Sequence, residues 1–161
     1  MSLVAMGMTY AKEVSADEKA LLKHEFEVAR NCVATNIYHE ARSESILAQK
    51  AVAFVTLNRV QHTAYPDDPC AVAYDAVLDS AGNPVRYKCQ FSWYCDGKSD
   101  KTTDQRSWKK AVDLASDVLR GYGKVEDPTD GAVMYHATYA DPYWAPHYDK
   151  TVQIDTHIFY K

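Results

Sequence analysis

The sequence predicts a single α+β domain, with a mainly helical core and a small antiparallel β element near the C-terminus. Apolar residues recur with helical spacing in three segments before Gly121. Alternation typical of β-strands begins only after Pro128. No internal repeat, low-complexity tract or linker divides the 161 residues. A chain of this length can bury a core without metals or added cross-links, so one domain is the simplest organisation.

The first segment, residues 1–14, is expected to be a leader or a tag-like stretch, with the domain covering residues 15–161. It is mildly apolar but has no basic start, and its apolar run is too short for a signal peptide or a membrane span. An expression tag and the remnant of a trimmed precursor both fit this composition. We therefore expect no export signal in the chain as given.

Two helices are predicted in the first third of the domain. Ser15 and Glu18 form a capping box that begins the first helix, and its apolar positions follow helical spacing up to Glu40 at the C-terminal end. Those positions are Leu22, Phe26, Ala29, Val33 and Ile37. The second helix, about residues 47–60, is apolar nearly all round, which is typical of a helix in the middle of a domain.

The stretch 65–104 is rich in Pro, Gly, Asp and Ser and has little periodicity. It is predicted to be a long ordered loop, and we expect it to form one wall of a groove because loops of that length in a compact domain are usually functional. A third helix is predicted over residues 104–120, with one apolar face and Gly121 as its C-cap.

Two strands are predicted near the C-terminus, over residues 131–138 and 151–160, with an aromatic loop at 139–147 between them. In the second strand, Val152, Ile154, Ile158 and Tyr160 alternate with Gln153, Asp155, His157 and Phe159. The alternation predicts that His157 faces away from Ile158.

Composition limits the classes of partner. A net charge of -4, a pI near 5.8 and the lack of a Lys/Arg run argue against binding of nucleic acid or of an anionic membrane surface. No stable membrane insertion is expected. The twelve Tyr and three Trp suit sugar faces and stacked ligands as well as core packing.

The four cysteines leave two interpretations open. Cys89 and Cys95 have five residues between them, which allows a small disulfide loop and implies an oxidising compartment. Four buried thiols in a cytosolic protein fit the spacing equally well. A bridge between Cys32 and Cys70 is a further hypothesis. None of the spacings resembles a pair of zinc knuckles.

The segment 38–44 places two carboxylates one helical turn apart, Glu40 and Glu44, on either side of Arg42. If the backbone there is helical, their like charges repel, so one of them must point into solvent or hold its proton. A carboxyl group that holds its proton is what a general acid requires. The alternative is a solvated charged turn at a helix end.

Four blocks, in order, resemble the SleB-type cell wall hydrolase family, which includes spore cortex-lytic enzymes, bacterial wall hydrolases and phage endolysins. The first three are residues 37–44 (IYHEARSE), 49–60 (QKAVAFVTLNRV) and 89–93 (CQFSW) with Asp96 and Gly97. The fourth comprises Gly131-Ala132, Tyr135-His136-Ala137, Trp144-Ala145 and residues 157–160 (HIFY). The resemblance covers about residue 28 to the C-terminus and implies a lysozyme-like fold.

The resemblance also implies cleavage of the β-1,4 bond between N-acetylmuramic acid and N-acetylglucosamine, with Glu40 as general acid and base and without a cofactor or metal. In a lytic transglycosylase the 6-hydroxyl of muramic acid attacks, giving a 1,6-anhydro sugar. A hydrolytic muramidase needs a second carboxylate, for which Glu44 is the first candidate. A helix C-terminus, Glu44 and aromatic walls are expected to raise the pKa of Glu40.

Further site residues follow from the matching motifs. Tyr135 is expected to act beside Glu40 as a second catalytic residue, and Glu44 either to tune Glu40 or to cap the next helix, the structural role being preferred. Substrate binding is expected from Gln90, Ser92, Trp93, His136 and Trp144. Phe91 and His157 are expected to be structural.

The segment 42–43 carries two further expectations. Arg42 is expected to be a salt-bridge partner. Ser43 stands where the family pattern has Gly, so the turn there is made by Ser at positive φ or is not left-handed.

Two other functions are weighed. A zinc amidase would need ligands from His39, His136, His147 and His157 with Glu40 as base, but the chain has no HExxH motif. A non-catalytic wall-binding module would have the aromatic groove without the acid. The expected partner is the peptidoglycan glycan strand, bound by a monomer in the periplasm or cell wall, with the host cytoplasm as the earlier location of a phage endolysin.

Overall fold

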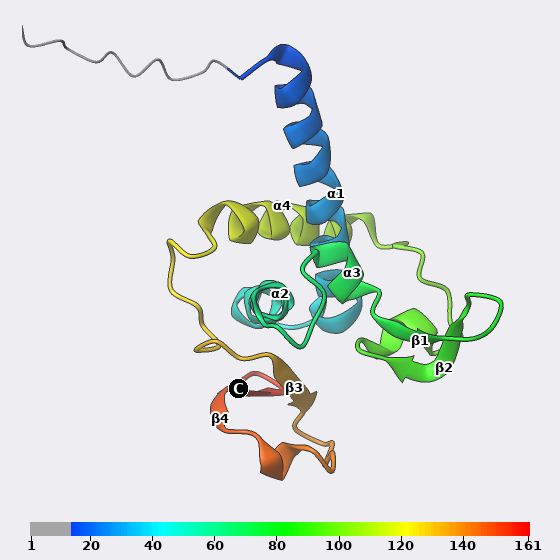
Figure 1. The fold of residues 1–161 in the computed structure, drawn as a ribbon. Coiled ribbons are helices and arrows are strands. Elements are labelled where there is room, and N and C mark those ends of the chain that lie inside the picture. The colour runs from blue at the N-terminus through cyan, green and yellow to red at the C-terminus, as the bar shows by residue number, and fades with distance from the viewer. Residues whose placement is uncertain (1–13) are drawn as a thin grey trace, which may run out of the picture.

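The computed structural model describes residues 14–161, so the expected leader lies outside the described residues except for Val14. The elements are α1 (Ala16–Ala41), α2 (Ile46–Gln61), α3 (Pro69–Ala73), β1 (Ala76–Leu78), β2 (Pro84–Cys89), α4 (Gln105–Gly121), β3 (Met134–Ala137), β4 (Lys150–Ile154) and β5 (His157–Tyr160), with the short 3-10 turns η1 (Ser92–Cys95) and η2 (Ala145–His147). The α+β prediction is confirmed: helices come first, and a small antiparallel sheet closes the domain (Figure 1).

Side-chain caps begin the three long helices. Ser15 Oγ accepts a hydrogen bond from the Glu18 amide, Ser45 Oγ accepts one from Ala48, and Asp104 accepts two at the start of α4. The predicted helices are confirmed, and α2 packs centrally against α1 and α4 as expected. α4 ends with Gly121 as its last helical residue, so the expected cap at Gly121 is displaced to the next position.

The helical core is built from the C-terminal half of α1 together with α2 and α4. Its buried members are Val33, Ala34, Ile37, Tyr38, Ala53, Phe54, Leu57, Ala111, Ala115 and Val118. The N-terminal half of α1 stands clear of the body (Figure 1), and Leu21 and Leu22 are more than half exposed. Of the apolar stripe that predicts α1, only the part from Val33 onward is fully buried. None of the described helices is long and apolar enough to cross a membrane.

The segment 65–104 is not one long loop, which corrects the prediction. It contains α3, the β1–β2 hairpin and η1. These elements are too short for a periodic pattern, and local chemistry supports them instead. Asp68 caps α3 ahead of Pro69, and the Asp79 carboxylate accepts amide hydrogen bonds within the hairpin turn.

Two disulfide bonds stabilise this part of the chain, so the interpretation as free thiols is wrong. Cys32–Cys70 joins α1 to α3, and Cys89–Cys95 joins the end of β2 to η1. Phe91 and Trp93, between the cysteines of the second bridge, pack with Val72 in a small buried cluster. The first bridge therefore fixes the segment against the helical core, and the second closes a small loop within it.

The C-terminal sheet has the strand order β3-β5-β4 and is antiparallel. The stretch 151–160 is two strands joined by a tight turn at Asp155 and Thr156, with Asp155 at φ 48°. Because Ile154 pairs with His157 across the turn, these two share a face, and the predicted alternation is wrong from Asp155 onward. His157 still faces away from Ile158, as expected.

The inward face of this sheet covers α2. Phe159, which the alternation had placed with the polar residues, is fully buried against Ala48, Ala51 and Val55 of α2. The sheet is thereby fixed to the helical core along the same helix that carries Arg59 toward the site described below.

Candidate active site

A cavity of about 320 Å³ opens where the C-terminal end of α1 meets the residues after β2 and the C-terminal sheet. Residues from five parts of the chain line it: His39 and Glu40 from α1, Arg59 from α2, Gln90, Phe91 and Ser92 after β2, Tyr135, His136, Ala137 and Tyr139 on and after β3, and His157 from β5. Glu40 is the one acidic residue among these described lining residues.

Glu40 lies next to last in α1, and the hydroxyl of Tyr135 donates a 2.8 Å hydrogen bond to its Oε2. Burial raises the pKa of Glu40, while the Tyr135 hydrogen bond and the positive charge of Arg59 act in the opposite direction. The expected rise in pKa is confirmed, but Glu44 is not among its causes. Burial also raises the pKa of Tyr135 well above its ordinary value, so its hydroxyl stays a neutral donor.

Arg59 is a buried cation beside this pair, with only 4% of its surface exposed. Its Nε donates to the Val133 carbonyl oxygen at 2.7 Å, and its guanidinium lies over the rings of Phe91 and Tyr65 at 4.6 and 5.1 Å. It belongs to none of the ion pairs among residues 14–161. Burial lowers the pKa of Arg59, and the aromatic faces and the nearby Glu40 carboxyl group, rather than a direct ion pair, offset the cost of burying this charge.

His157 closes the cavity on the sheet side. Its ring meets Tyr135 edge to face at 5.3 Å, and its buried Nδ1 has no hydrogen-bond partner. Burial lowers the pKa of His157, so the ring is neutral near pH 7. The expected structural role agrees with this packing, because the ring holds the Tyr135 side chain from one side.

Glu44 does not join Glu40. Because α1 ends at Ala41, the two carboxylates are not neighbours on one helix, and Glu44 is absent from the lining residues. Its Oε1 accepts a 2.8 Å hydrogen bond from the Thr156 hydroxyl. Glu44 was expected to cap the next helix, but Ser45 is the residue that caps α2.

The sequence also led to expectations for Arg42 and Ser43, the two residues before Glu44. Ser43 is not among the residues at positive φ, so the turn is not left-handed there. The expectation of a salt bridge at Arg42 is wrong: its guanidinium lies 4.9 Å from the ring centroid of Tyr38 and forms none of the described ion pairs.

The five expected binding residues divide into two groups. Gln90 and Ser92 are exposed and line the cavity, and half-buried His136 lines it with Nε2 2.9 Å from the Tyr160 hydroxyl oxygen. Trp93 and Trp144 are not lining residues. The sequence had no signal for this division, since it depends on which way each side chain turns.

The two tryptophans have structural positions instead. Trp93 is buried, donates from Nε1 to Asn36 Oδ1 at 2.9 Å and stacks on His39 with ring centroids 4.7 Å apart. Trp144 packs edge to face with His136 and with Tyr160, on the face of the sheet turned away from α2. Both therefore support lining residues from behind.

Six lining residues were not among the expected catalytic and binding residues: His39, which was considered only as a metal ligand, Arg59, Phe91, Ala137, Tyr139 and His157. Arg59 did leave a signal, because a charged residue within a helix that is apolar nearly all round needs a partner or a function. Tyr139 left none, since an aromatic residue in a loop is common. Phe91 is both buried, as expected, and a lining residue.

The histidines do not form a metal site. Across residues 14–161, no group of three or more His, Cys, Asp or Glu side chains is arranged to hold a metal ion. His136 faces Tyr160 and Ala137, whereas His39 stacks on Trp93. The geometric basis for a zinc amidase is therefore missing in the described part of the chain.

The fold and the cavity together define a lysozyme-like α+β domain with a single protonatable carboxyl group in its cleft. The chain belongs to the cell wall hydrolase family, whose family model matches residues 43–160. The matched range includes Arg59 and Tyr135, and Glu40 lies just before it.

Solved structures agree with this assignment. The catalytic domain of the germination-specific lytic transglycosylase SleB from Bacillus anthracis is 29% identical, with a TM-score of 0.61 over 83% of this chain and 93% of that domain. The catalytic domain of the Bacillus cereus SleB protein is 28% identical, with a TM-score of 0.55 over 86% and 91%. The expected SleB-type family is confirmed.

A curated relative gives the same family. The spore cortex-lytic enzyme of Halalkalibacterium halodurans is 28% identical over 128 residues, which are 79% of this chain. The chain spans only about a third of that relative's length, 33%.

Proposed function

We propose that this protein is a lytic transglycosylase that cleaves the β-1,4 bond between N-acetylmuramic acid and N-acetylglucosamine in peptidoglycan. The observation that carries the proposal is the single carboxyl group in the cavity, Glu40, whose pKa burial raises. A retaining or inverting hydrolase uses two carboxylates, whereas intramolecular attack by a sugar hydroxyl needs only one. The likeness to a SleB catalytic domain described as a lytic transglycosylase supports the same reaction.

In the first step, protonated Glu40 donates its proton to the glycosidic oxygen. The bond from C1 of muramic acid to that oxygen breaks, and N-acetylglucosamine leaves with a free 4-hydroxyl. Glu40 becomes a carboxylate at the moment when positive charge develops at C1. The Tyr135 hydrogen bond and the nearby Arg59 cation both favour the ionised carboxyl group, so they stabilise this state.

In the second step, the 6-hydroxyl of the same muramic acid attacks C1 and passes its proton to Glu40. A 1,6-anhydro ring forms, the acid is restored and no water is consumed. Tyr135 keeps the same Glu40 oxygen bonded through both steps, which leaves the other oxygen free to move the proton.

The hydrolytic muramidase is the second candidate, and it would require a carboxylate to activate water. Glu44 is the residue that the sequence suggests, but its carboxylate is bonded to Thr156 and lies outside the described lining. A wall-binding module without catalysis would have no use for an acid held between Tyr135 and a buried cation. Both alternatives are therefore less well supported.

Mass spectrometry of muropeptides released from purified peptidoglycan tests the proposal. The wild-type protein should release products ending in 1,6-anhydro-muramic acid, and Glu40→Gln should release none. Glu44→Gln serves as the matched control and should keep the anhydro products. Reducing-end muramic acid would instead indicate hydrolysis, and free peptides with intact glycan would indicate an amidase.

The proposal extends to partner and location. The partner is the peptidoglycan glycan strand, and the protein acts as a monomer, which is the simplest state for an enzyme that works on a polymer. Two disulfides agree with work in an oxidising place such as the periplasm or the cell wall.

A further inference from the structure

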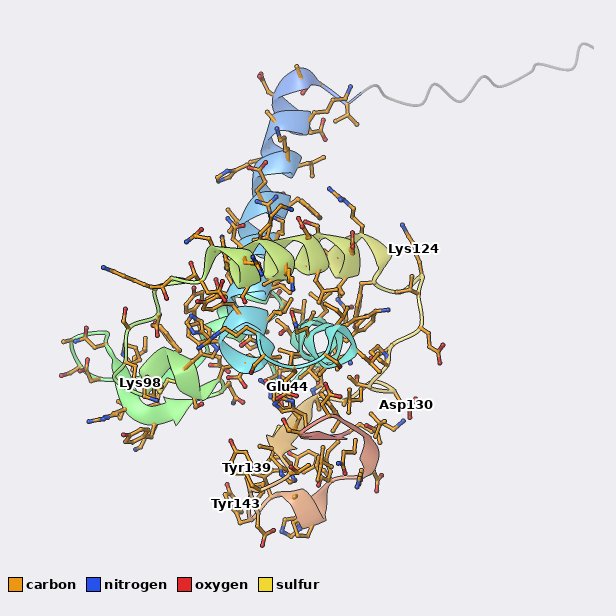
Figure 2. The ribbon with its side chains drawn as sticks, turned by 180° about the vertical axis from the view of Figure 1, so that it is seen from behind. Glu44, Lys98, Lys124, Asp130, Tyr139 and Tyr143 are labelled. Atoms are coloured by element: carbon orange, nitrogen blue, oxygen red, sulfur yellow. A yellow bond between two sulfur atoms is a disulfide. The ribbon has the colours of Figure 1, made fainter. Side chains whose placement is uncertain are left out.

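Two tyrosines in the loop between β3 and β4 are almost fully exposed. Tyr139 has 91% of its surface exposed and Tyr143 has 89%. Tyr139 also lines the cavity that holds Glu40. Figure 2 shows both residues at the same edge of the C-terminal sheet, beyond Glu44 and away from the N-terminal half of α1.

The loop that carries these tyrosines is fixed at its base. Trp144, directly after Tyr143, packs edge to face against His136, Tyr148 and Tyr160. The amide of Ala140 bonds to the Ala137 carbonyl oxygen, and that of Ala145 bonds to Pro142. The two tyrosine rings are thus presented on an anchored loop.

The folded chain makes little use of the two rings. Neither ring pairs with another aromatic ring among residues 14–161, and neither hydroxyl makes a described hydrogen bond, in contrast to Tyr135, Tyr122 and Tyr160. A tyrosine left this exposed gives up the burial of a large apolar face. Single exposed apolar residues are ordinary, but two on one loop next to a catalytic cavity point to a ligand.

We propose that Tyr139 and Tyr143 form a stacking platform that extends the cleft and binds further sugar rings of the glycan strand. This proposal rests on the function proposed above. The apolar C–H face of a pyranose ring packs on an aromatic ring, and tyrosine offers a rigid, amphipathic face at low entropic cost. The two residues are four positions apart, so at most about 14 Å of chain separates them, a span of a few sugar rings.

The platform suits the sugars better than the stem peptides. The sugar backbone presents neutral faces, as the two tyrosine rings do, whereas the peptides carry carboxylates and amines. The platform also continues directly from the cavity, because Tyr139 belongs to both. A glycan strand whose scissile bond lies at Glu40 would therefore extend past Tyr139.

Isothermal titration calorimetry with purified glycan strands, made soluble by amidase removal of their stem peptides, tests the platform. The full chain carries Glu40→Gln so that nothing is cleaved, and it is compared with and without the pair Tyr139→Ala and Tyr143→Ala. We expect the pair to weaken binding about tenfold. Tyr87→Ala is the matched control, since Tyr87 is 69% exposed on β2 and outside the cavity lining. It should change binding less than twofold.

A conservative pair separates stacking from hydrogen bonding. Tyr139→Phe with Tyr143→Phe keeps both rings, so binding should stay near that of the parent. Because the residues are exposed, all variants should unfold at the parent's temperature.

Unchanged binding by the Ala pair would overturn the proposal. So would a loss seen only with strands that retain their peptides, or an equal loss in the Phe pair. None of these results depends on which sugar end the active enzyme produces, so the platform and the transglycosylase proposal can fail separately.

Discussion

At the scale of single residues, Glu40 is subject to two opposing influences. Burial favours its protonated form, whereas Tyr135 and Arg59 favour its ionised form. An acid that must donate a proton and then take one back benefits from such a balance, because neither state is strongly trapped. The matching motifs in the sequence predicted Glu40 and Tyr135 as neighbouring site residues, but they did not indicate that Arg59, 19 positions from Glu40, lies beside them.

Replacing Glu40 should change how stability depends on pH. Because the folded-state pKa of Glu40 is raised, its contribution to stability is fully present below the unfolded pKa and is lost as pH rises through the folded pKa. Gln does not titrate and can still accept the Tyr135 hydrogen bond. Glu40→Gln should therefore become more stable relative to wild type as pH rises from about 4, measured by thermal unfolding at several pH values. A constant difference across that range would contradict the raised pKa.

Removing the Tyr135 hydroxyl should shift the pH profile. The hydrogen bond lowers the pKa of Glu40, so Tyr135→Phe should raise that pKa and move the alkaline limb of the rate profile to higher pH. The maximal rate should fall about 10- to 100-fold, since a hydrogen bond to a charged group is lost. Release of soluble muropeptides over a pH series measures both effects.

Tyr122→Phe is the matched control for that experiment. The Tyr122 hydroxyl donates to Asn58 Oδ1 and not to Glu40, so its removal should leave the pH profile in place. An alkaline limb that moves to lower pH in Tyr135→Phe would show that the hydroxyl does not stabilise the carboxylate.

At the scale of elements, the turn after α1 is fastened to the turn between β4 and β5. The Thr156 hydroxyl donates to Glu44, and the Ser45 amide donates to the Asp155 carboxylate at 2.8 Å. These bonds join the helix that carries Glu40 to the hairpin that carries His157. Helices could be predicted from apolar spacing and caps, but this hairpin turn could not, because Asp155 and Thr156 interrupt an otherwise uniform strand pattern without Gly or Pro.

Thr156→Val tests this connection between the turns. Val has nearly the shape of Thr but cannot donate to Glu44, so the free energy of unfolding should fall by about 0.5–1 kcal/mol. Chemical denaturation measures the change. Exposed Thr63, which follows α2, is the matched position, and Thr63→Val should have a smaller effect. Equal effects at the two positions would mean that the bond to Glu44 contributes nothing measurable.

At the scale of the whole molecule, one cross-link holds the segment between α2 and α4 against α1, and a second closes a small loop within that segment. Cys32–Cys70 spans 38 positions, and Cys89–Cys95 spans six. The sequence left the choice between thiols and disulfides open because spacing alone does not show which cysteines meet. It also missed the hairpin in this segment, since β1 and β2 are mostly exposed and lack an alternating apolar pattern.

The two disulfide bonds should differ in their effects on stability and on glycan binding. Loss of the longer loop through Cys32→Ala with Cys70→Ala should lower the free energy of unfolding by about 2–4 kcal/mol, since a longer closed loop restricts the unfolded chain more. Cys89→Ala with Cys95→Ala should cost less stability but weaken glycan binding, because Gln90 and Ser92 lie within that small loop. Denaturation and titration calorimetry of both pairs give the comparison. A larger loss of stability from the shorter loop would contradict this division.

The strand order of the C-terminal sheet has a consequence for the timing of activity during synthesis. β5 is the centre strand, yet it is translated after both of its neighbours, β3 and β4, which do not pair with each other. A nascent chain that lacks β5 has no sheet to hold Tyr135 against Glu40. The position of Tyr135 opposite Glu40 therefore depends on the last strand to be synthesised, and the cavity is complete only after residues 157–160 have paired with β3.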